Sequence, residues 1–165
     1  MRINFQKTLL KAIPVVDVQS VVVEIGAGRE SLDLVGCRYL SVDSRILTAP
    51  YIVGSVDSLP IRSNSADVVL GSRLLCSVHS IPRALREIRR VLKPHGVYIG
   101  IEHCRDPALP LAEIQSIRNV FRAKRGLCRL GVDVGAELFA AGYEVSIARK
   151  PYPANPVLVF VATLA

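Results

Sequence analysis

The stretch SVVVEIGAG at residues 20–28 constrains the fold more than any other part of the chain. Three consecutive valines favour extended backbone and lead through Glu24 into the turn formed by Gly26, Ala27 and Gly28. Glycine tolerates the left-handed backbone of such a turn and lets backbone N–H groups approach a ligand. Ligands of open α/β sheets bind beyond the carboxyl ends of the strands, so this turn predicts a binding site for a nucleotide-like molecule.

A second acidic residue supports that prediction, although glycines also end strands for purely structural reasons. The strand expected over residues 38–43 ends in Asp43, whose carboxylate can accept two hydrogen bonds from a ribose diol. No third glycine of a dinucleotide fingerprint follows Gly28, and Glu30 places a carboxylate near the expected phosphate position. Because a carboxylate repels pyrophosphate, the sequence disfavours NAD and FAD and favours a nucleoside without phosphates.

Composition limits the class of protein. A chain of 165 residues, half of them hydrophobic, is expected to form one packed domain over residues 1–165. The amino-terminal stretch lacks a signal-peptide pattern, and no run of about 18 apolar residues occurs. We therefore expect a soluble cytoplasmic protein with no membrane partner.

The charge and the cysteines each leave an alternative open. A net charge of +7 could attract nucleic acid, but solvated helix faces explain it equally well, so nucleic acid is not favoured as a partner.

Cys37, Cys76, Cys104 and Cys128 show neither a C-x-x-C motif nor histidines at zinc-binding spacing. The sequence thus predicts no metal site and small buried thiols. A bridge between Cys104 and Cys128 stays open, because both flank one predicted helix.

The hydrophobic patterns alternate between strands and helices. The expected strands cover residues 20–25, 38–43, 51–55, 67–71, 97–102, 143–149 and 156–163. The expected helices cover residues 4–12, residues 81–92 after the cap Ser80, a part of 103–130, and residues 132–141. The connections after the first two strands are too short for full helices, and the last two strands must pair antiparallel. These patterns predict an α/β fold with a mostly parallel sheet of seven strands.

Several motifs resemble those of class I methyltransferases that use S-adenosylmethionine (SAM). EIGAG resembles their first motif, VDSR their second, and SADVVLGSRLLCSVHSIPRALREIRRVLKPHGVYIGIEH resembles the type 11 methyltransferase domain. Further motifs are similar to those of small thiol S-methyltransferases: GCR at 36–38, LCSV at 75–78, LRE at 85–87, EH at 102–103 and a Gly, Cys, Leu pattern within 126–130. The resemblance implies a Rossmann-like fold and SAM as the cofactor.

The same resemblance implies which residues bind the cofactor. Glu24, Gly26, Ala27 and Gly28 would hold its methionine end and ribose, Asp43 its ribose hydroxyls, and Ser72 and Arg73 its methionine. Family members carry the pattern GDAxxLP where this chain has GSVDSLP, so Ser55 stands where an aspartate is expected. Either Ser55 or Asp57 would then contact the adenine amino group, and the backbone of Val56 would face the ring.

Methyl transfer needs little catalytic machinery, because the sulfonium donor is already activated and the protein mainly aligns the reactants. A hydroxyl or thiol acceptor would benefit from a base. His103 is the preferred candidate because it follows the fifth strand and has an ordinary pKa near neutrality; Glu102, His79 and Asp106 are the others. A histidine at a strand end also serves as a structural hydrogen-bonding group.

Three functional hypotheses follow. The first is a SAM-dependent methyltransferase acting on a small molecule through a thiol or hydroxyl. The second is methylation of RNA or protein with the help of a basic helix face: Arg118, Arg122, Lys124, Arg125 and Arg129. The third is a SAM-binding protein without catalysis. The sequence leaves the oligomeric state open, a homodimer included.

Overall fold

A single sheet of seven strands forms the centre of the molecule. The computed structural model describes residues 11, 13, 16–28, 32, 34–45, 52–125, 127–150 and 157–165. Its strands are β1 (Val21–Ile25), β2 (Arg38–Asp43), β3 (Ile52–Val53), β4 (Ala66–Ser72), β5 (Leu92–His103), β6 (Tyr143–Lys150) and β7 (Val157–Leu164). The helix expected over residues 4–12 lies outside the described residues except for position 11.

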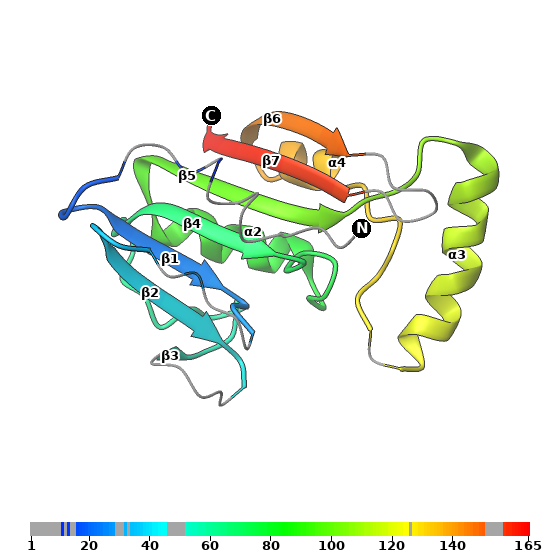
Figure 1. The fold of residues 1–165 in the computed structure, drawn as a ribbon, viewed down its shortest axis with the longest axis horizontal. Coiled ribbons are helices and arrows are strands. Elements are labelled where there is room, and N and C mark those ends of the chain that lie inside the picture. Colours follow the sequence, from blue (N-terminus) through cyan, green and yellow to red (C-terminus); the bar gives the residue numbers. More distant parts are fainter. Residues whose placement is uncertain are drawn as a thin grey trace.

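The strand order is β3-β2-β1-β4-β5-β7-β6 (Figure 1). Strands β1 to β5 pair in parallel, whereas β7 runs antiparallel to both of its neighbours, β5 and β6. This arrangement confirms the predicted Rossmann-like sheet with its antiparallel pair at one end. It also brings the carboxyl ends of β1, β2, β4 and β5 to the same edge of the sheet.

In the part of the chain that the structure describes, three labelled helices accompany the sheet: α2 (Ile81–Val91), α3 (Leu109–Ala123) and α4 (Val134–Ala140). The hydroxyl of Ser80 accepts a hydrogen bond from the Arg83 backbone N–H and caps α2, as predicted. Helices α2 and α4 pack on one face of the sheet, where Leu85 and Leu138 join one hydrophobic core with Val23 and Val69. Figure 1 shows α3 apart from both, beyond the carboxyl end of β5.

Two element boundaries differ from the predicted ones for local reasons. Strand β5 begins at Leu92, because this buried residue already pairs with Ala66, and the predicted turn at residues 93–96 becomes an irregularity inside the strand. A Cβ at Gly96 would come within 2.9 Å of the Ala66 carbonyl oxygen, so glycine is needed there. Strand β3 ends at Val53, since Ser55 turns back to bridge with Ser58.

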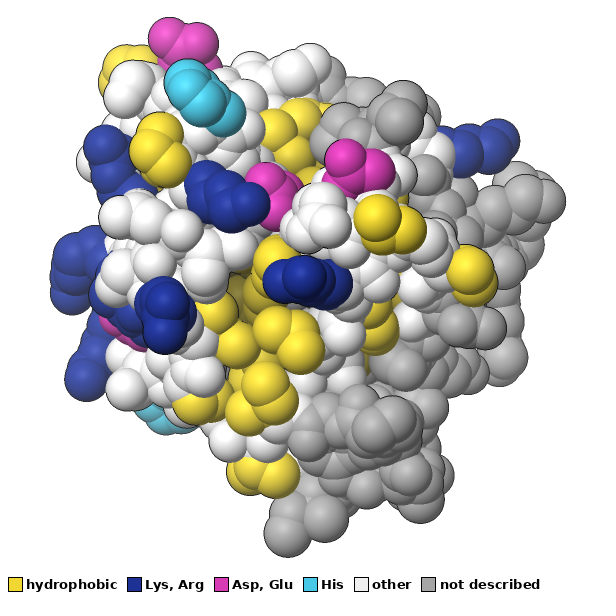
Figure 2. All heavy atoms as spheres, turned by 90° about the vertical axis from the view of Figure 1, so that its left-hand side faces the viewer, with side chains coloured by type: hydrophobic (Ala, Val, Ile, Leu, Met, Phe, Trp, Pro, Cys, Tyr) yellow, Lys and Arg dark blue, Asp and Glu magenta, His cyan; other side chains and the backbone are white. Residues whose placement is uncertain are grey.

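The described helices include none that is both long and apolar enough to span a membrane. Figure 2 shows the face that presents the amino ends of the parallel strands. Several of its lysine and arginine side chains gather along one edge of this view, and others stand singly among apolar, acidic and neutral groups.

Candidate functional site

The turn after β1 has the backbone that its two glycines permit. Gly26 and Gly28 have φ angles of +71° and +67°, in the left-handed region. The Gly26 N–H donates to the Val42 carbonyl at 2.8 Å and so ties the turn to the end of β2. A Cβ at Gly26 would lie 3.5 Å from Leu74, whereas no described atom lies within 4 Å of a Cβ at Gly28. The turn is therefore open beside Gly28, and Ala27 between them is half-buried.

Asp43 meets this turn at the carboxyl end of β2. Its Oδ2 accepts a hydrogen bond from the Gly28 N–H at 3.0 Å, and its Oδ1 accepts one from the Arg45 N–H at 3.0 Å. The Arg45 guanidinium lies 3.5 Å from the same Oδ1. The side chain is only 5% exposed. The structure thus brings together the glycine turn and the carboxylate that the sequence assigned to one site.

Glu24 is held inside the protein. Its Oε2 accepts hydrogen bonds from the Leu32 N–H at 3.0 Å and from the Tyr39 hydroxyl. Burial raises the pKa of this carboxyl, although both hydrogen bonds act in the opposite direction. These contacts give Glu24 a role in fixing the chain after the glycine turn. Its predicted contact with the cofactor stays a prediction.

Residues 55–57 form a tight turn next to Asp43, whose carbonyl accepts the Gly54 N–H at 2.9 Å. Ser55 is exposed, and its hydroxyl accepts the Asp57 N–H at 3.2 Å. Val56 packs against the hydrophobic core. The Oδ1 of Asp57 is buried and has no hydrogen-bond partner among the described residues. Of the two residues left open by the sequence, Asp57 is the one with an unsatisfied acceptor.

The segment after β4 borders the glycine turn. Ser72 ends the strand half-buried, and Arg73 has a φ of +55°, which is unusual for a residue with a side chain. The Arg73 N–H donates to the Ile101 carbonyl at 2.7 Å, and its carbonyl accepts the Ser77 hydroxyl at 2.7 Å. Leu74, which sequence reasoning did not single out, would lie 3.5 Å from a Cβ at Gly26 and 3.3 Å from a Cβ at Gly71.

Glu102 anchors this segment from the adjacent strand. The residue is fully buried, and its two oxygens accept the Leu75 and Cys76 N–H groups at 2.8 and 3.1 Å. Burial raises the pKa of Glu102 to about 7, although the hydrogen bonds from Leu75 and Cys76 lower it. Glu102 therefore positions the backbone after β4, which the sequence indicated only through its place at a strand end.

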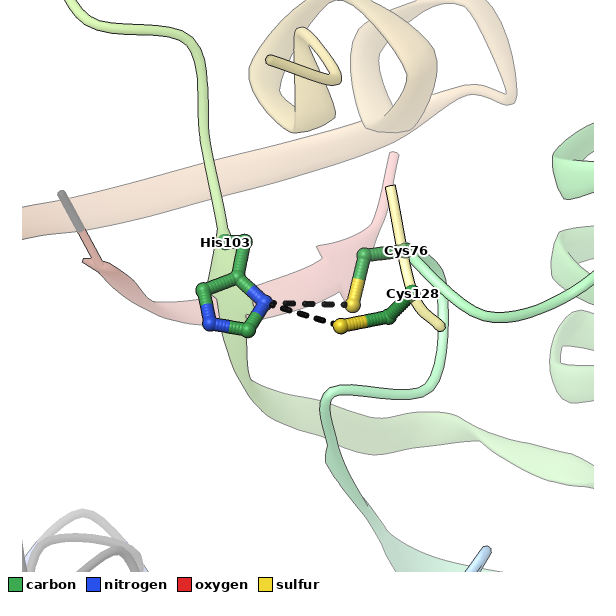
Figure 3. Close-up of side chains that lie close together, drawn as sticks. All are labelled: Cys76, His103 and Cys128. Atoms are coloured by element: carbon green, nitrogen blue, oxygen red, sulfur yellow. Dashed lines mark hydrogen bonds between the residues drawn. The ribbon is translucent and has the colours of Figure 1, made fainter. Parts of the chain in front are cut away.

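His103 lies at the end of β5 with its Nδ1 directed at two sulfur atoms (Figure 3). Nδ1 is 3.6 Å from Cys76 Sγ and 3.4 Å from Cys128 Sγ, and the ring is 8% exposed. The other ring nitrogen points away from the sulfurs, so only Nε2 remains for the predicted role as a base, which stays a prediction. No disulfide joins any of the four cysteines, so the bridge between Cys104 and Cys128 is not formed, and Cys128 lies beside Cys76.

The pKa values of Cys76 and Cys128 are shifted in opposite directions. Hydrogen bonds from Cys76 and then from His103 hold the pKa of Cys128 well below its ordinary value, and the Arg122 guanidinium, 3.0 Å from its Sγ, acts in the same direction. The hydrogen bond to Cys128, together with burial, raises the pKa of Cys76. These opposite shifts favour ionisation of Cys128 over ionisation of Cys76.

The remaining candidate bases are less well placed. His79 is exposed on the loop before α2, and Asp106 is buried with its Oδ1 accepting the Ala108 N–H at 3.0 Å. A cavity of about 210 Å³ lies beside Asp106, between residues 104–107 and 132–135. It does not include the glycine turn, and its volume is below that of ordinary ligand pockets.

The basic side chains expected on and after helix α3 do not all face solvent. Arg122 donates to the Cys128 carbonyl at 2.7 Å, and Arg129 donates to the Val78 carbonyl at 2.8 Å. These two cations serve internal contacts, which weakens the hypothesis of a face for nucleic acid. The apolar positions predicted for this helix are largely exposed, with Ile117 and Phe121 both at 63%. Its buried side carries Ala112 and polar Gln115 instead.

Comparison with known proteins gives one family and several partial relatives. The family described as methyltransferase domain matches residues 16–100, just over half of the chain. The mitochondrial arginine-hydroxylase NDUFAF5 of Danio rerio is 39% identical over 54 residues, 33% of this chain and 17% of that protein. The human thiol S-methyltransferase TMT1B is 43% identical over 51 residues, 31% of this chain and 21% of that protein. The matches thus span about a fifth of the relatives' length.

Solved structures resemble the whole chain. The YcgJ protein of Bacillus subtilis superimposes with a TM-score of 0.74 at 13% identity, over 97% of this chain and 98% of that chain. The geranyl diphosphate C-methyltransferase of Streptomyces coelicolor, solved with S-adenosyl-L-homocysteine, gives a TM-score of 0.72 at 11% identity, over 97% and 79% of the two chains. At these identities the likeness concerns the fold.

Proposed function

The chain belongs to the methyltransferase domain family and uses S-adenosylmethionine as its cofactor, and from this premise we propose that it methylates a thiol of a small molecule. One observation carries the choice of a thiol. Three of the motifs that resemble small thiol S-methyltransferases contribute Cys76, His103 and Cys128, and these side chains meet at one place. The partial match to human TMT1B supports the same choice.

We propose that the cofactor lies along the carboxyl ends of β1, β2 and β4. The ribose hydroxyls would be bound by Asp43, beside the open side of Gly28. The adenine amino group would donate to the unsatisfied Oδ1 of Asp57, with Val56 below the ring. Ser72 and Arg73 would contact the methionine end, on the segment that continues into the loop with Cys76.

The reaction itself is a direct displacement. The acceptor thiol loses its proton to solvent, and the thiolate attacks the methyl carbon while the bond from that carbon to the sulfonium sulfur breaks. The new carbon–sulfur bond gives the methyl thioether, and S-adenosylhomocysteine leaves. Free thiols have pKa values of about 8.5, so a useful fraction is ionised near neutrality. The chain then has only to align the two reactants and exclude water.

A second candidate acceptor is a side chain of a protein. The match to the zebrafish arginine-hydroxylase favours this class, because that name describes a protein acting on arginine. Two arginines of the expected basic face hold internal contacts, which makes the same face less available for a macromolecule. We therefore place the small-molecule thiol first.

Transfer of a radiolabelled methyl group to matched acceptors tests this proposal. The acceptor panel pairs each thiol with the alcohol of the same carbon skeleton and includes an arginine-rich protein and RNA. We expect label in the thiols and little in the alcohols. Label confined to protein or RNA would overturn the choice of a thiol. Calorimetric titration with SAM, run on the same protein, tests the cofactor site separately from the acceptor.

A further inference from the structure

We propose that Cys76, His103 and Cys128 bind one zinc ion. Their ligand atoms lie within 4.8 Å of one another, and no other such group occurs among the described residues. The three residues come from separate segments: the loop after β4, the end of β5, and the stretch that follows α3 (Figure 3). The proposed site is distinct from the cofactor contacts around Gly28 and Asp43.

The distances between the donor atoms fit a tetrahedral zinc site. Zinc binds thiolate sulfur at about 2.3 Å and imidazole nitrogen at about 2.0–2.1 Å, which separates the two donors by roughly 3.6 Å at a tetrahedral angle. Nδ1 of His103 lies 3.6 Å from one sulfur and 3.4 Å from the other. Both nitrogen–sulfur separations therefore already fit a zinc ion, and the two sulfur atoms lie within 4.8 Å of each other.

Hydrogen bonding accounts for only one of the two nitrogen–sulfur contacts of His103. Nδ1 carries either one proton or one lone pair, so it forms a good hydrogen bond with only one of the two sulfurs. A metal ion is bound by the lone pairs of all three atoms at once. Two thiolates and a neutral imidazole also give the donor set that Zn²⁺ prefers over the hard cations Mg²⁺ and Ca²⁺.

Backbone contacts around the cluster hold the ligands in place, while Arg122 also donates to Cys128 Sγ at 3.0 Å and the Cys76 thiol to the Arg73 carbonyl at 3.4 Å. The Cys76 N–H donates to Glu102, and the Cys76 carbonyl accepts the Arg129 N–H at 2.8 Å. The Cys128 carbonyl accepts Arg122 Nε at 2.7 Å. Such supporting contacts orient metal ligands and tune the site. They also connect the loop after β4 to the stretch after α3. A zinc ion bound by Cys76 and Cys128 would add a second connection between these two segments.

Zinc binding has a consequence for His103. With Nδ1 on the metal, Nε2 carries the ring proton, so His103 cannot also act as the base. Three protein donors leave the fourth tetrahedral position for water or another outside ligand. The proposed site therefore replaces the predicted catalytic role of His103 with coordination.

Metal analysis of the reduced full chain tests the site. The protein is incubated with Zn²⁺, dialysed, and measured by mass spectrometry of the metal. We expect about one zinc ion per chain for the parent and less than about a tenth of this for Cys128→Ser and for His103→Gln. Replacement by Co²⁺ should give thiolate-to-cobalt absorption in the parent, and Cys128→Ser should lose it.

Cys37→Ser is the matched control, because Cys37 is also partly buried but lies outside the cluster, just before β2. It should retain zinc and the cobalt spectrum. Circular dichroism and SAM titration of every variant show whether it folds, so loss of metal is separable from loss of structure or cofactor. The proposal is wrong if the reduced parent binds neither metal, or if Cys128→Ser binds zinc as well as the parent. A Cys76–Cys128 disulfide in a chain that binds no metal after reduction would also overturn it.

Discussion

The two halves of the carboxyl edge of the sheet are built in different ways. At β1 and β2 the site consists mainly of backbone. Two glycines adopt the left-handed conformation, and the Asp43 carboxylate accepts the Gly28 N–H. At β4 and β5 it consists of side chains from three distant segments, gathered around His103 and supported by buried Glu102. Backbone sites depend on a few consecutive residues, whereas side-chain clusters depend on the complete fold. The first half therefore suits a cofactor shared across a family, and the second suits contacts that form only once the whole chain has folded.

The largest expected effect is on the carboxylate of the first half. Asp43→Ala should weaken SAM binding by on the order of 100- to 10,000-fold, because hydrogen bonds to charged groups contribute about 1.5–3 kcal/mol each and two would be lost. Isothermal titration calorimetry measures this change. Asp67→Ala is the control, since Asp67 also binds a backbone N–H and a cation, those of Val21 and Lys93, near the opposite edge of the sheet. If both variants bound SAM as tightly as the parent, Asp43 would not be part of the cofactor site.

The next effect concerns pH and the buried carboxyl of the second half. The pKa of Glu102 is raised from 4.5 to about 7, so the folded state binds its proton more tightly than the unfolded state. The contribution of Glu102 to the free energy of unfolding should therefore be greatest below pH 4.5. It should fall as the pH rises toward 7. The contribution reaches at most about 3 kcal/mol.

Urea unfolding between pH 4.5 and 7.5 measures this dependence. Glu102→Gln cannot ionise, so its free energy of unfolding should lose that part of the slope while the raised pKa of Glu24 still contributes. Glu113→Gln, on the exposed surface of α3, should keep the slope of the parent. A slope unchanged in Glu102→Gln would show that this carboxyl does not titrate with unfolding.

A smaller effect separates backbone strain from ligand contact in the first half. Gly28→Ala places a methyl group in the open space beside the turn, and it should weaken SAM binding about tenfold if the cofactor fills that space. Gly36→Ala is matched, because Gly36 also has a positive φ and no described atom near its Cβ position. Both variants should lose about 1 kcal/mol of stability, and only Gly28→Ala should lose affinity.

Much of the first half could be predicted from sequence, and the reason is local. The turn at Gly26 and Gly28 needs glycine at fixed positions, and Asp43 follows from its place at the end of a short buried strand. The parallel pairing of the first five strands likewise follows from the alternation of strands and helices. A hairpin at the chain end is dictated by its short connection.

The second half could not be predicted in the same way. Cys76, His103 and Cys128 lie 27 and 25 residues apart, without any spacing typical of metal ligands. Only the parallel pairing of β4 with β5 and the return of the chain after α3 bring them together. The prediction of no metal site rested on spacing, which carries no information about contacts between segments.

The smallest expected effect is on α3. The sequence pattern of this helix resembles that of α2, yet α2 buries Leu85 and Ile88 whereas α3 exposes Ile117. Ile117→Ser should change the free energy of unfolding by less than about 0.5 kcal/mol, because exposed side chains lose little on substitution. Leu85→Ala, at the same kind of helical position but fully buried, should cost about 2–5 kcal/mol. Denaturant unfolding compares the two, and a loss above about 1 kcal/mol for Ile117→Ser would mean that α3 is covered in solution.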